Sequence, residues 1–272
     1  MLSSPPAFAD SVRRPQSVGV HQPPLSILMY HQVGEFPSPK SHRAGFCHIR
    51  RFRRQMAYLK RGGYGVLSLR QAVDSLFYGG EPLPEWGVVL TFDDGYENFR
   101  QYAFPVLQEL GFPAAVFLVS GCVGKNARWL EKDGRYGPPL MAATALRELR
   151  SHGVTLGSHT VTHPRLSTLD PMAMRGEVLM SKRHLQDMLG ENVDFFCYPY
   201  GDYDERVRDT VQEAGYDAAL TCIRGAANTA DNPFEIPRKA ISYGDNLLGY
   251  FWKLHMKHQR KDRPRLSERA DR

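Results

Sequence analysis

Residues 88–96 read VVLTFDDGY, an apolar run that ends in two adjacent carboxylates. A short apolar run bounded by a turn signal predicts a buried strand, and Gly95 supplies the turn. Asp93 and Asp94 then stand at the carboxyl end of a strand, which is the edge where ligands bind in α/β folds. Two neighbouring carboxylates in a low-dielectric site repel each other unless one of them ligates a cation. Taken alone, the pair is equally compatible with an exposed turn.

Strand-like and helix-like segments alternate along the chain, which predicts an α/β fold with parallel strands. The chain has 272 residues and 42% hydrophobic residues, enough for the core of a single domain. Glycines follow four of the helical patterns, as C-terminal stop signals do. Periodicity alone does not distinguish a barrel from an open doubly wound sheet. The expected strands are 25–31, 65–69, 86–94, 114–120, 154–159, 194–200, 217–222 and 235–241, and the expected helices include 52–61, 98–110, 141–152, 171–189 and 204–214.

Two histidines follow another strand-like segment, in GVTLGSHTVTHP at residues 153–164. His159 and His163 are four residues apart, and on a helical turn residues i and i+4 share one face. This spacing favours a shared metal ion over two separate core histidines. One aspartate oxygen with two imidazole nitrogens leaves coordination positions open for water and substrate, which is typical of a catalytic zinc site.

Six short motifs in order give the chain a family resemblance. TFDDG (91–95), HTVTH (159–163) and YPYG (198–201) resemble the first three motifs of the polysaccharide deacetylases, carbohydrate esterase family 4. The flanking motifs resemble the branch that deacetylates exopolysaccharides, and the likeness covers residues 25–255. It implies a single-domain, distorted (β/α)7-type barrel. The flanking motifs are LMYH (28–31), FRRQMAYL (52–59) and IPR (236–238).

The resemblance also implies roles for individual residues. Asp93 corresponds to the catalytic base, and Asp94, His159 and His163 correspond to the metal ligands. The backbone amide of Tyr200, beside the proline of the third motif, corresponds to a donor for the oxyanion.

Two departures from the family pattern concern Asp93 and the general acid. Many members have an arginine at the start of the third motif that orients the catalytic aspartate, but this chain has FFCY at residues 195–198. We expect Arg238, which ends another strand-like run, to take over that task. The late Leu-His-Asp motif, which carries the usual general acid, is also absent. Either Asp93 returns the proton or His31, at the end of the first strand, donates it, and the sequence argument favours Asp93.

The resulting hypothesis is a metal-dependent hydrolase that removes N-acetyl groups from N-acetylglucosamine units of a polysaccharide or oligosaccharide. Two alternatives stay open: an O-acetyl ester or small-amide hydrolase of the same superfamily, and a non-catalytic glycan-binding domain. The ligand set suits Zn²⁺, although Co²⁺, Ni²⁺ and Fe²⁺ also accept imidazole and carboxylate. Aromatic candidates for a sugar groove are Trp129, Tyr136, Tyr200 and Tyr203.

Charge concentrates at the C-terminus. The net charge is +6, and residues 253–272 hold eight basic and three acidic side chains, so five of the six charges lie there. A nearly neutral body excludes a global nucleic-acid-binding surface. We expect residues 1–24 and 256–272 to be disordered. No secretory signal or membrane span is evident in the sequence, which predicts a cytoplasmic protein.

Overall fold

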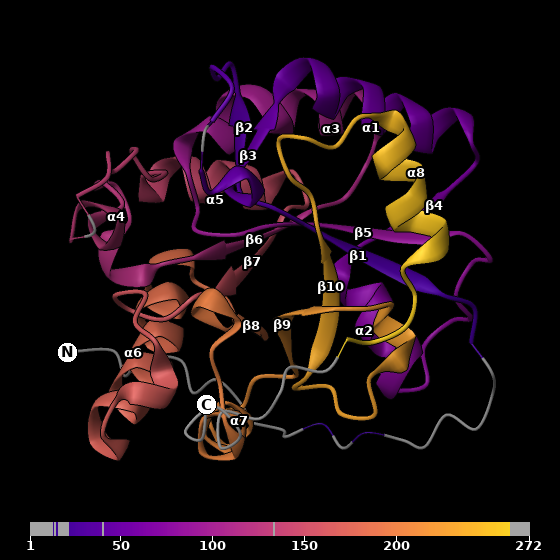
Figure 1. Ribbon diagram of the computed structural model, residues 1–272. Helices are drawn as coiled ribbons and strands as arrows, with labels where there is room; N and C mark the ends of the chain where they lie inside the picture. Colours follow the sequence, from indigo (N-terminus) through magenta and orange to yellow (C-terminus); the bar gives the residue numbers. More distant parts are fainter. Residues whose placement is uncertain (1–12, 14, 16–21, 40, 133, 262–272) are drawn as a thin grey trace, which may run out of the picture.

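A closed barrel of parallel strands forms the centre of the molecule (Figure 1). The computed structural model describes residues 13, 15, 22–39, 41–132 and 134–261. Seven strands follow the order β1-β10-β9-β8-β7-β6-β5, and β5 pairs with β1 to close the ring. The expected barrel is therefore confirmed. Its strands are β1 (Leu25–Tyr30), β5 (Gly87–Phe92), β6 (Ala115–Leu118), β7 (Thr155–Ser158), β8 (Phe195–Cys197), β9 (Ala218–Arg224) and β10 (Ile236–Ala240).

The barrel is irregular at three places. β4 (Gly65–Leu67) pairs with the amino-terminal half of β5, whereas β6 pairs with its last two residues. β7 and β8 share a single register pair, Ser158 with Phe196. The pairing of β9 and β10 shifts between Ile236 and Arg238, where Pro237 lacks the N–H that a regular ladder requires. Outside the barrel, β2 (Gln32–Gly34) and β3 (Phe46–His48) form a small parallel sheet.

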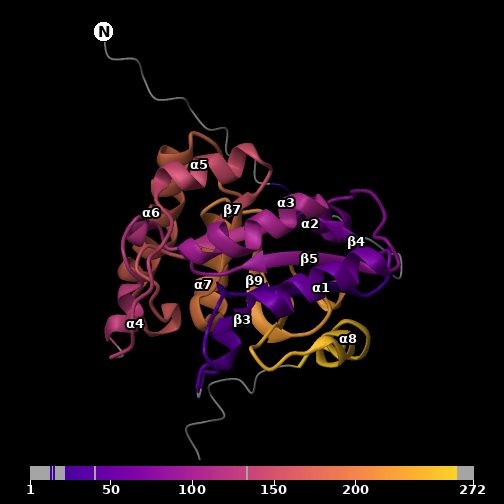
Figure 2. The same cartoon turned by 90° about the horizontal axis from the view of Figure 1, so that it is seen from above.

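Helices surround the barrel, and the expected ones are present (Figures 1 and 2). The predicted helix 98–110 begins with a π-helical turn, Phe99–Ala103, before α3. Helix α2 was not among the expected helices, and its apolar side packs with residues of β1, β5 and β10 in one cluster. The helices are α1 (Ile49–Arg61), α2 (Leu69–Phe77), α3 (Phe104–Leu110), α4 (Arg128–Lys132), α5 (Ala143–Ser151), α6 (Pro171–Leu189), α7 (Glu205–Glu213) and α8 (Leu247–Met256).

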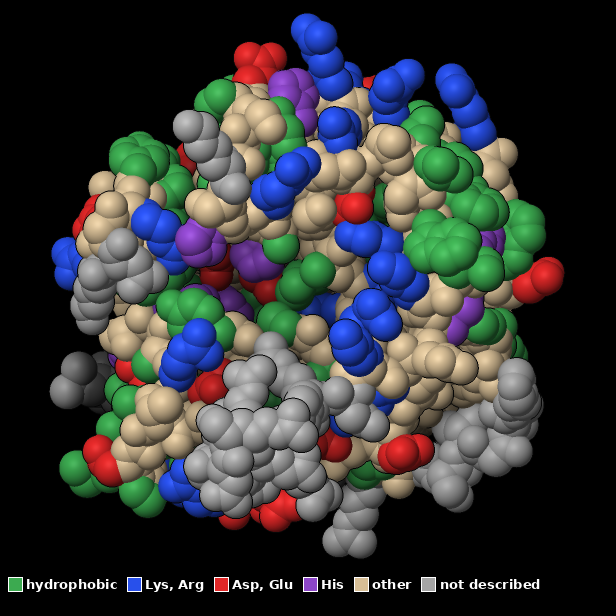
Figure 3. Space-filling view, viewed as in Figure 1, with side chains coloured by type: hydrophobic (Ala, Val, Ile, Leu, Met, Phe, Trp, Pro, Cys, Tyr) green, Lys and Arg blue, Asp and Glu red, His purple; other side chains and the backbone are tan. Residues whose placement is uncertain are grey.

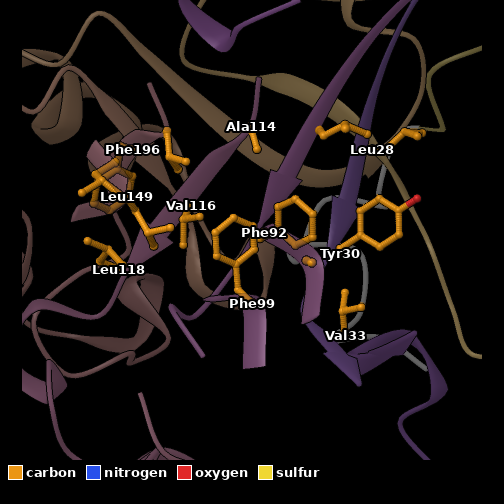
Figure 4. Close-up of a cluster of buried hydrophobic side chains, with 14 of the residues drawn as sticks. Leu28, Tyr30, Val33, Phe92, Phe99, Ala114, Val116, Leu118, Leu149 and Phe196 are labelled. Atoms are coloured by element: carbon orange, nitrogen blue, oxygen red, sulfur yellow. The ribbon is translucent and has the colours of Figure 1, made fainter. Parts of the chain in front are cut away.

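Alternate residues of each strand enter two separate cores. In β5, Val88, Leu90 and Phe92 belong to the larger core beneath the surrounding helices, and Val89 belongs to a second core inside the barrel. Figure 4 shows part of the larger core, where Phe92 stacks on Tyr30 at 5.2 Å between ring centroids. Because side chains alternate along a strand, the next inward positions after Val89 are Thr91 and Asp93. The strand pattern thus places Asp93 at the mouth of the barrel.

The predicted terminal segments lie mostly outside the described residues. Within the predicted tail, the His258 carbonyl accepts a hydrogen bond from Ala226 N–H, and Lys261 N–H donates to the Arg224 carbonyl. This part of the tail is therefore attached to the end of β9. No helix in the described ranges combines the length and apolar character that crossing a bilayer requires.

Candidate metal centre and active site

The two carboxylates lie at the carboxyl end of β5, as predicted. Asp93 N–H donates to the Tyr30 carbonyl at 3.0 Å, which continues the β1–β5 ladder by one residue. Asp94 then adopts φ 76°, a conformation that is uncommon outside glycine, and Gly95 adopts φ 76° as well. This turn separates the two side chains, so Asp93 and Asp94 contact different partners.

The two histidines lie after β7 in a loop. The expected helical turn is wrong, because residues 159–163 are not helical and Thr160 and His163 have φ values of 68° and 63°. The Thr160 hydroxyl accepts a hydrogen bond from His163 N–H at 3.0 Å. The reversal in this loop brings the imidazoles together, with ring centroids of His159 and His163 4.9 Å apart.

Asp94, His159 and His163 form a buried group that fits a metal ion. Asp94 Oδ1 lies 3.5 Å from His159 Nε2 and 3.3 Å from His163 Nε2. Zinc bonds of about 2.0–2.1 Å in tetrahedral geometry place ligand atoms about 3.3 Å from one another. Asp94 Oδ1 is buried and has no hydrogen-bond partner among the described residues. A buried, unpartnered carboxylate oxygen is costly, and a cation between the three groups would satisfy it.

Neighbouring groups orient the two imidazoles. His159 Nδ1 lies 2.6 Å from the Cys197 carbonyl, so the Nδ1–H donates there and the Nε2 lone pair faces Asp94. The His163 ring stacks on Trp129, with centroids 4.6 Å apart and an interplanar angle of 24°. Tyr200 contacts the same ring edge-on at 4.6 Å. Figure 3 shows histidine and acidic side chains together in a hollow on the left of the view.

Arg238 holds Asp93 through a two-pronged ion pair, and it does so from the middle of β10 rather than from the end of a strand. Nη1 donates to Oδ1 at 2.8 Å and Nη2 donates to Oδ2 at 2.7 Å. The guanidinium also donates to the Thr221 carbonyl and to the Thr91 hydroxyl, at 2.9 and 3.0 Å. Both charged side chains are almost completely buried. The shifted pairing before Arg238 in β10 positions this side chain inside the barrel.

Cys197 completes the surroundings of Asp93. Its thiol donates to Asp93 Oδ2 at 3.6 Å, and its sulfur accepts a hydrogen bond from Arg238 Nη2 at 3.0 Å. Asp93, His159 and Cys197 are close enough to form a second candidate ligand group. We exclude a metal there, because Arg238 already occupies both oxygens of Asp93 and His159 Nδ1 donates to a carbonyl.

Burial and the ion pair have opposite effects on the pKa of Asp93. Burial alone would raise the pKa, but the charge and hydrogen bonds of Arg238 outweigh it and lower the pKa below its usual value. Asp93 is therefore ionised at neutral pH. Burial, opposed by Asp94, lowers the pKa of His163, which favours the neutral imidazole that a metal requires.

The match to a family model agrees with this geometry. The model described as "Polysaccharide deacetylase" matches residues 80–219, just over half of the chain. The chain belongs to the polysaccharide deacetylase family. Its members are enzymes. Five of the six motifs that carried the resemblance lie on barrel strands or on the loops that follow them, and the sixth, residues 52–59, lies on α1.

Individual relatives agree with this membership. The putative polysaccharide deacetylase YxkH of Bacillus subtilis is 28% identical, over 81% of this chain and 72% of that protein. The poly-beta-1,6-N-acetyl-D-glucosamine N-deacetylase of Escherichia coli K12 is 31% identical, over 72% of this chain but only 33% of that protein. Among solved structures, the Streptococcus pyogenes deacetylase PplD has the same fold, with a TM-score of 0.74, 23% identity and coverage of 86% of this chain and 100% of that chain.

Glu177 is a site residue of this deacetylase that sequence reasoning missed. It lies on α6, and its Oε2 accepts hydrogen bonds from the N–H groups of Val161 and Thr162 at 2.8 and 2.9 Å. Its Oε1 accepts from the Thr162 hydroxyl at 2.7 Å. One carboxylate thus fixes the loop that carries both histidine ligands. Its position two helical turns into α6, far from any motif, gave no signal.

The predicted oxyanion donor lies in a tight turn beside the metal group. Tyr200 adopts φ 58° in the turn Pro199–Gly201, and Gly201 follows at φ 62°. A Cβ on Gly201 would lie 2.6 Å from the Cys222 Cβ and 2.8 Å from its backbone nitrogen. Glycine is therefore required for this turn to pack against β9.

The remaining predicted residues are divided between the site and the rest of the molecule. His31 follows β1 beside Asp93, and its Nδ1 is buried without a hydrogen-bond partner in the described part of the chain. Trp129 reaches the metal group, as described above. Tyr203 instead stacks on the buried Tyr198, and Tyr136 is 80% exposed.

Proposed function

We propose that this chain removes N-acetyl groups from N-acetylglucosamine units of a glycan, with Zn²⁺ held by Asp94, His159 and His163. The observation that carries the proposal is the buried three-ligand group with an ionised, arginine-paired carboxylate next to it. A bound metal would polarise the acetyl carbonyl and lower the pKa of its bound water to about 7. A glycan-binding module would not need the second buried carboxylate, whose charge is costly to bury.

Asp93 is proposed to accept the proton of the attacking water. Its ionisation at neutral pH, maintained by Arg238, makes it competent as a base. The same ion pair keeps its carboxylate in one orientation, because both bonds of the pair lie inside the barrel and the Thr221 carbonyl holds the guanidinium through a further bond. Arg238 therefore acts as a positioning residue.

His31 is proposed to donate the proton to the departing amine. The sequence argument favoured Asp93 for both steps, but a carboxyl paired with Arg238 holds a proton poorly. His31 lies at the same edge, next to Asp93, with an imidazole nitrogen that has no described partner. His31→Ala should lower kcat while leaving metal content unchanged.

The Tyr200 backbone amide is proposed to stabilise the tetrahedral oxyanion. The left-handed turn puts this residue against His163, beside the metal ligands. Loss of one such donor typically costs about 3 to 4 kcal/mol of transition-state stabilisation.

The proposed substrate is a poly-β-1,6-N-acetylglucosamine chain, by similarity to the Escherichia coli relative. Acetate release should be compared on β-1,6-linked and β-1,4-linked N-acetylglucosamine oligomers and on acetylated xylan, and hydrolysis of a ureide should be followed by loss of the ureide itself. Acetate release from acetylated xylan alone, or hydrolysis of the ureide alone, would refute N-deacetylation of glucosamine units. Asp93→Asn should retain metal and lose turnover, whereas His163→Ala should lose both.

A further inference from the structure

Helix α8 exposes an apolar face to solvent. Leu248, Phe251, Trp252 and Met256 recur at three- and four-residue intervals, and between 42% and 74% of each is exposed. Trp86, which precedes β5, is 48% exposed and lies 6.0 Å from the His255 ring on the same helix. Large contiguous apolar surfaces of this kind mark sites of interaction with a partner or a membrane.

Contacts with neighbouring rings hold the exposed rings of Trp86 and Phe251 in place. Trp86 contacts the Tyr64 ring at 5.6 Å, and Phe251 contacts the His255 ring at 4.4 Å. The Tyr64 hydroxyl in turn bonds to His255 Nε2 at 2.5 Å. The rings are therefore ordered before any partner binds, which reduces the entropy lost on binding.

The neighbouring helix α1 exposes only cations. It contains six basic residues and no acidic one, and none of the six forms an ion pair with a carboxylate in the described part of the chain. Figures 1 and 2 show α8 beside α1, and Figure 3 shows Lys and Arg side chains along the top, over α1, with apolar side chains to the right, over α8. The exposed cations are Arg50, Arg53, Arg54, Lys60 and Arg61.

We propose that the α1–α8 face binds the surface of an anionic lipid bilayer. The apolar side chains of α8 and Trp86 would enter the headgroup boundary, and the cations of α1 would meet lipid phosphates. Aromatic and aliphatic side chains flanked by Lys and Arg are typical of helices that lie in a membrane interface. The positive charge of α1 favours an anionic bilayer over a second copy of this chain, because a two-fold dimer through this face would bring the two cationic α1 helices together. An acidic polymer alone would leave Leu248 and Met256 uncovered.

Such binding leaves the metal centre accessible. Trp86 stands at the amino end of β5 and Asp93 at its carboxyl end. Seven residues of extended strand separate the two by about 23 Å. A glycan could therefore reach the site while the protein stays on the bilayer.

Cosedimentation of the full chain with vesicles tests this proposal. One vesicle type contains phosphatidylglycerol in phosphatidylcholine, and the other contains phosphatidylcholine alone. We expect binding only to the anionic vesicles, weakened by salt. The double variants Phe251→Ser/Trp252→Ser and Arg53→Glu/Arg54→Glu should each weaken binding by about tenfold or more.

Matched controls come from exposed residues of α6. Met172 is 85% exposed and Arg183 is exposed, so Met172→Ser and Arg183→Glu remove an apolar and a cationic side chain elsewhere. Both controls should bind like the wild type, and thermal unfolding checks that every variant is folded. The proposal is overturned if the wild type does not bind anionic vesicles, or if the double variants bind as tightly as it does. A dimer in sedimentation velocity that Phe251→Ser/Trp252→Ser dissociates would assign the face to a second copy instead.

Discussion

Replacing Arg238 by methionine tests how the protein keeps a charged base inside its barrel. Methionine preserves much of the volume of the side chain but removes the charge and every donor. Asp93 would then be buried, at 3% exposure, without its ion-pair partner. The Thr221 carbonyl would lose its bond to the guanidinium as well.

The magnitude follows from the burial of both partners. Removing one partner of a buried ion pair typically costs about 3–5 kcal/mol, because the other charge is left uncompensated. For a domain of this size, each kcal/mol lowers Tm by about 2–4 °C, so the variant should melt about 10 °C lower. An exposed pair of the same geometry would cost under about 1 kcal/mol.

The pH dependence separates a charge effect from lost packing. In the wild type the pKa of Asp93 is lowered, so the stability it contributes is present above its unfolded-state pKa and is lost as pH falls through the lower folded-state pKa. Without Arg238, burial raises the pKa of Asp93, and protonation at mildly acidic pH relieves the buried charge. The destabilisation relative to wild type should therefore shrink as pH falls from neutral toward about 5.

Urea unfolding of the metal-free proteins at the two pH values measures this difference. Working without metal prevents altered metal affinity from entering the result. A destabilisation below about 1 kcal/mol at neutral pH, or one of equal size at both pH values, would refute the electrostatic account. In the metal-loaded enzyme, the acidic limb of kcat/KM should move to higher pH.

Three further predictions concern the loop of the two histidines, the buried Lys239 and the Pro199–Gly201 turn. Glu177→Ala should weaken metal affinity about 10- to 100-fold in a competition assay. Glu177→Gln should weaken it less, because an amide oxygen in the place of Oε2 still accepts both loop N–H groups. Equal metal affinity in all three proteins would exclude this role. Burial lowers the pKa of Lys239 to about 7, so between pH 7 and 10 the unfolded state binds more protons than the folded state. The free energy of unfolding should therefore rise with pH by up to about 1.4 kcal/mol per pH unit. Lys239→Met should flatten that rise in urea unfolding, and an unchanged slope would contradict the prediction. Gly201→Ala should lower the free energy of unfolding by about 1–3 kcal/mol, because the turn has a positive φ and meets Cys222; a neutral effect would show that the turn can relax.

The strand framework and the edge that carries the site could be predicted because they depend on local pattern. The apolar run before Asp93, bounded by the Gly95 turn, predicts a buried strand, and parallel strands bring their carboxyl ends to one edge. Arg238 was proposed in the same way from a strand-like run, although the structure places it in the middle of β10 and not at its end. The register shift that aims its side chain at Asp93 depends on the pairing of β9 and β10, which no local pattern records.

Long-range packing decided what the sequence missed. The spacing of His159 and His163 suggested a helical turn, but the loop uses left-handed residues held by Glu177 from another element. The stacking of Trp129 on His163 joins the short helix α4 to the loop after β7. Contacts of this kind between distant segments leave no periodic signal in either segment.

Zinc titration of the metal-free protein, followed by acetate release from β-1,6-linked N-acetylglucosamine oligomers, tests the central claim most directly. Asp94, His159 and His163 form one ligand group around one centre. Acetate release should therefore be absent without metal and reach its maximum at one equivalent, with no recovery in His163→Ala. Full acetate release from the metal-free protein would contradict the account.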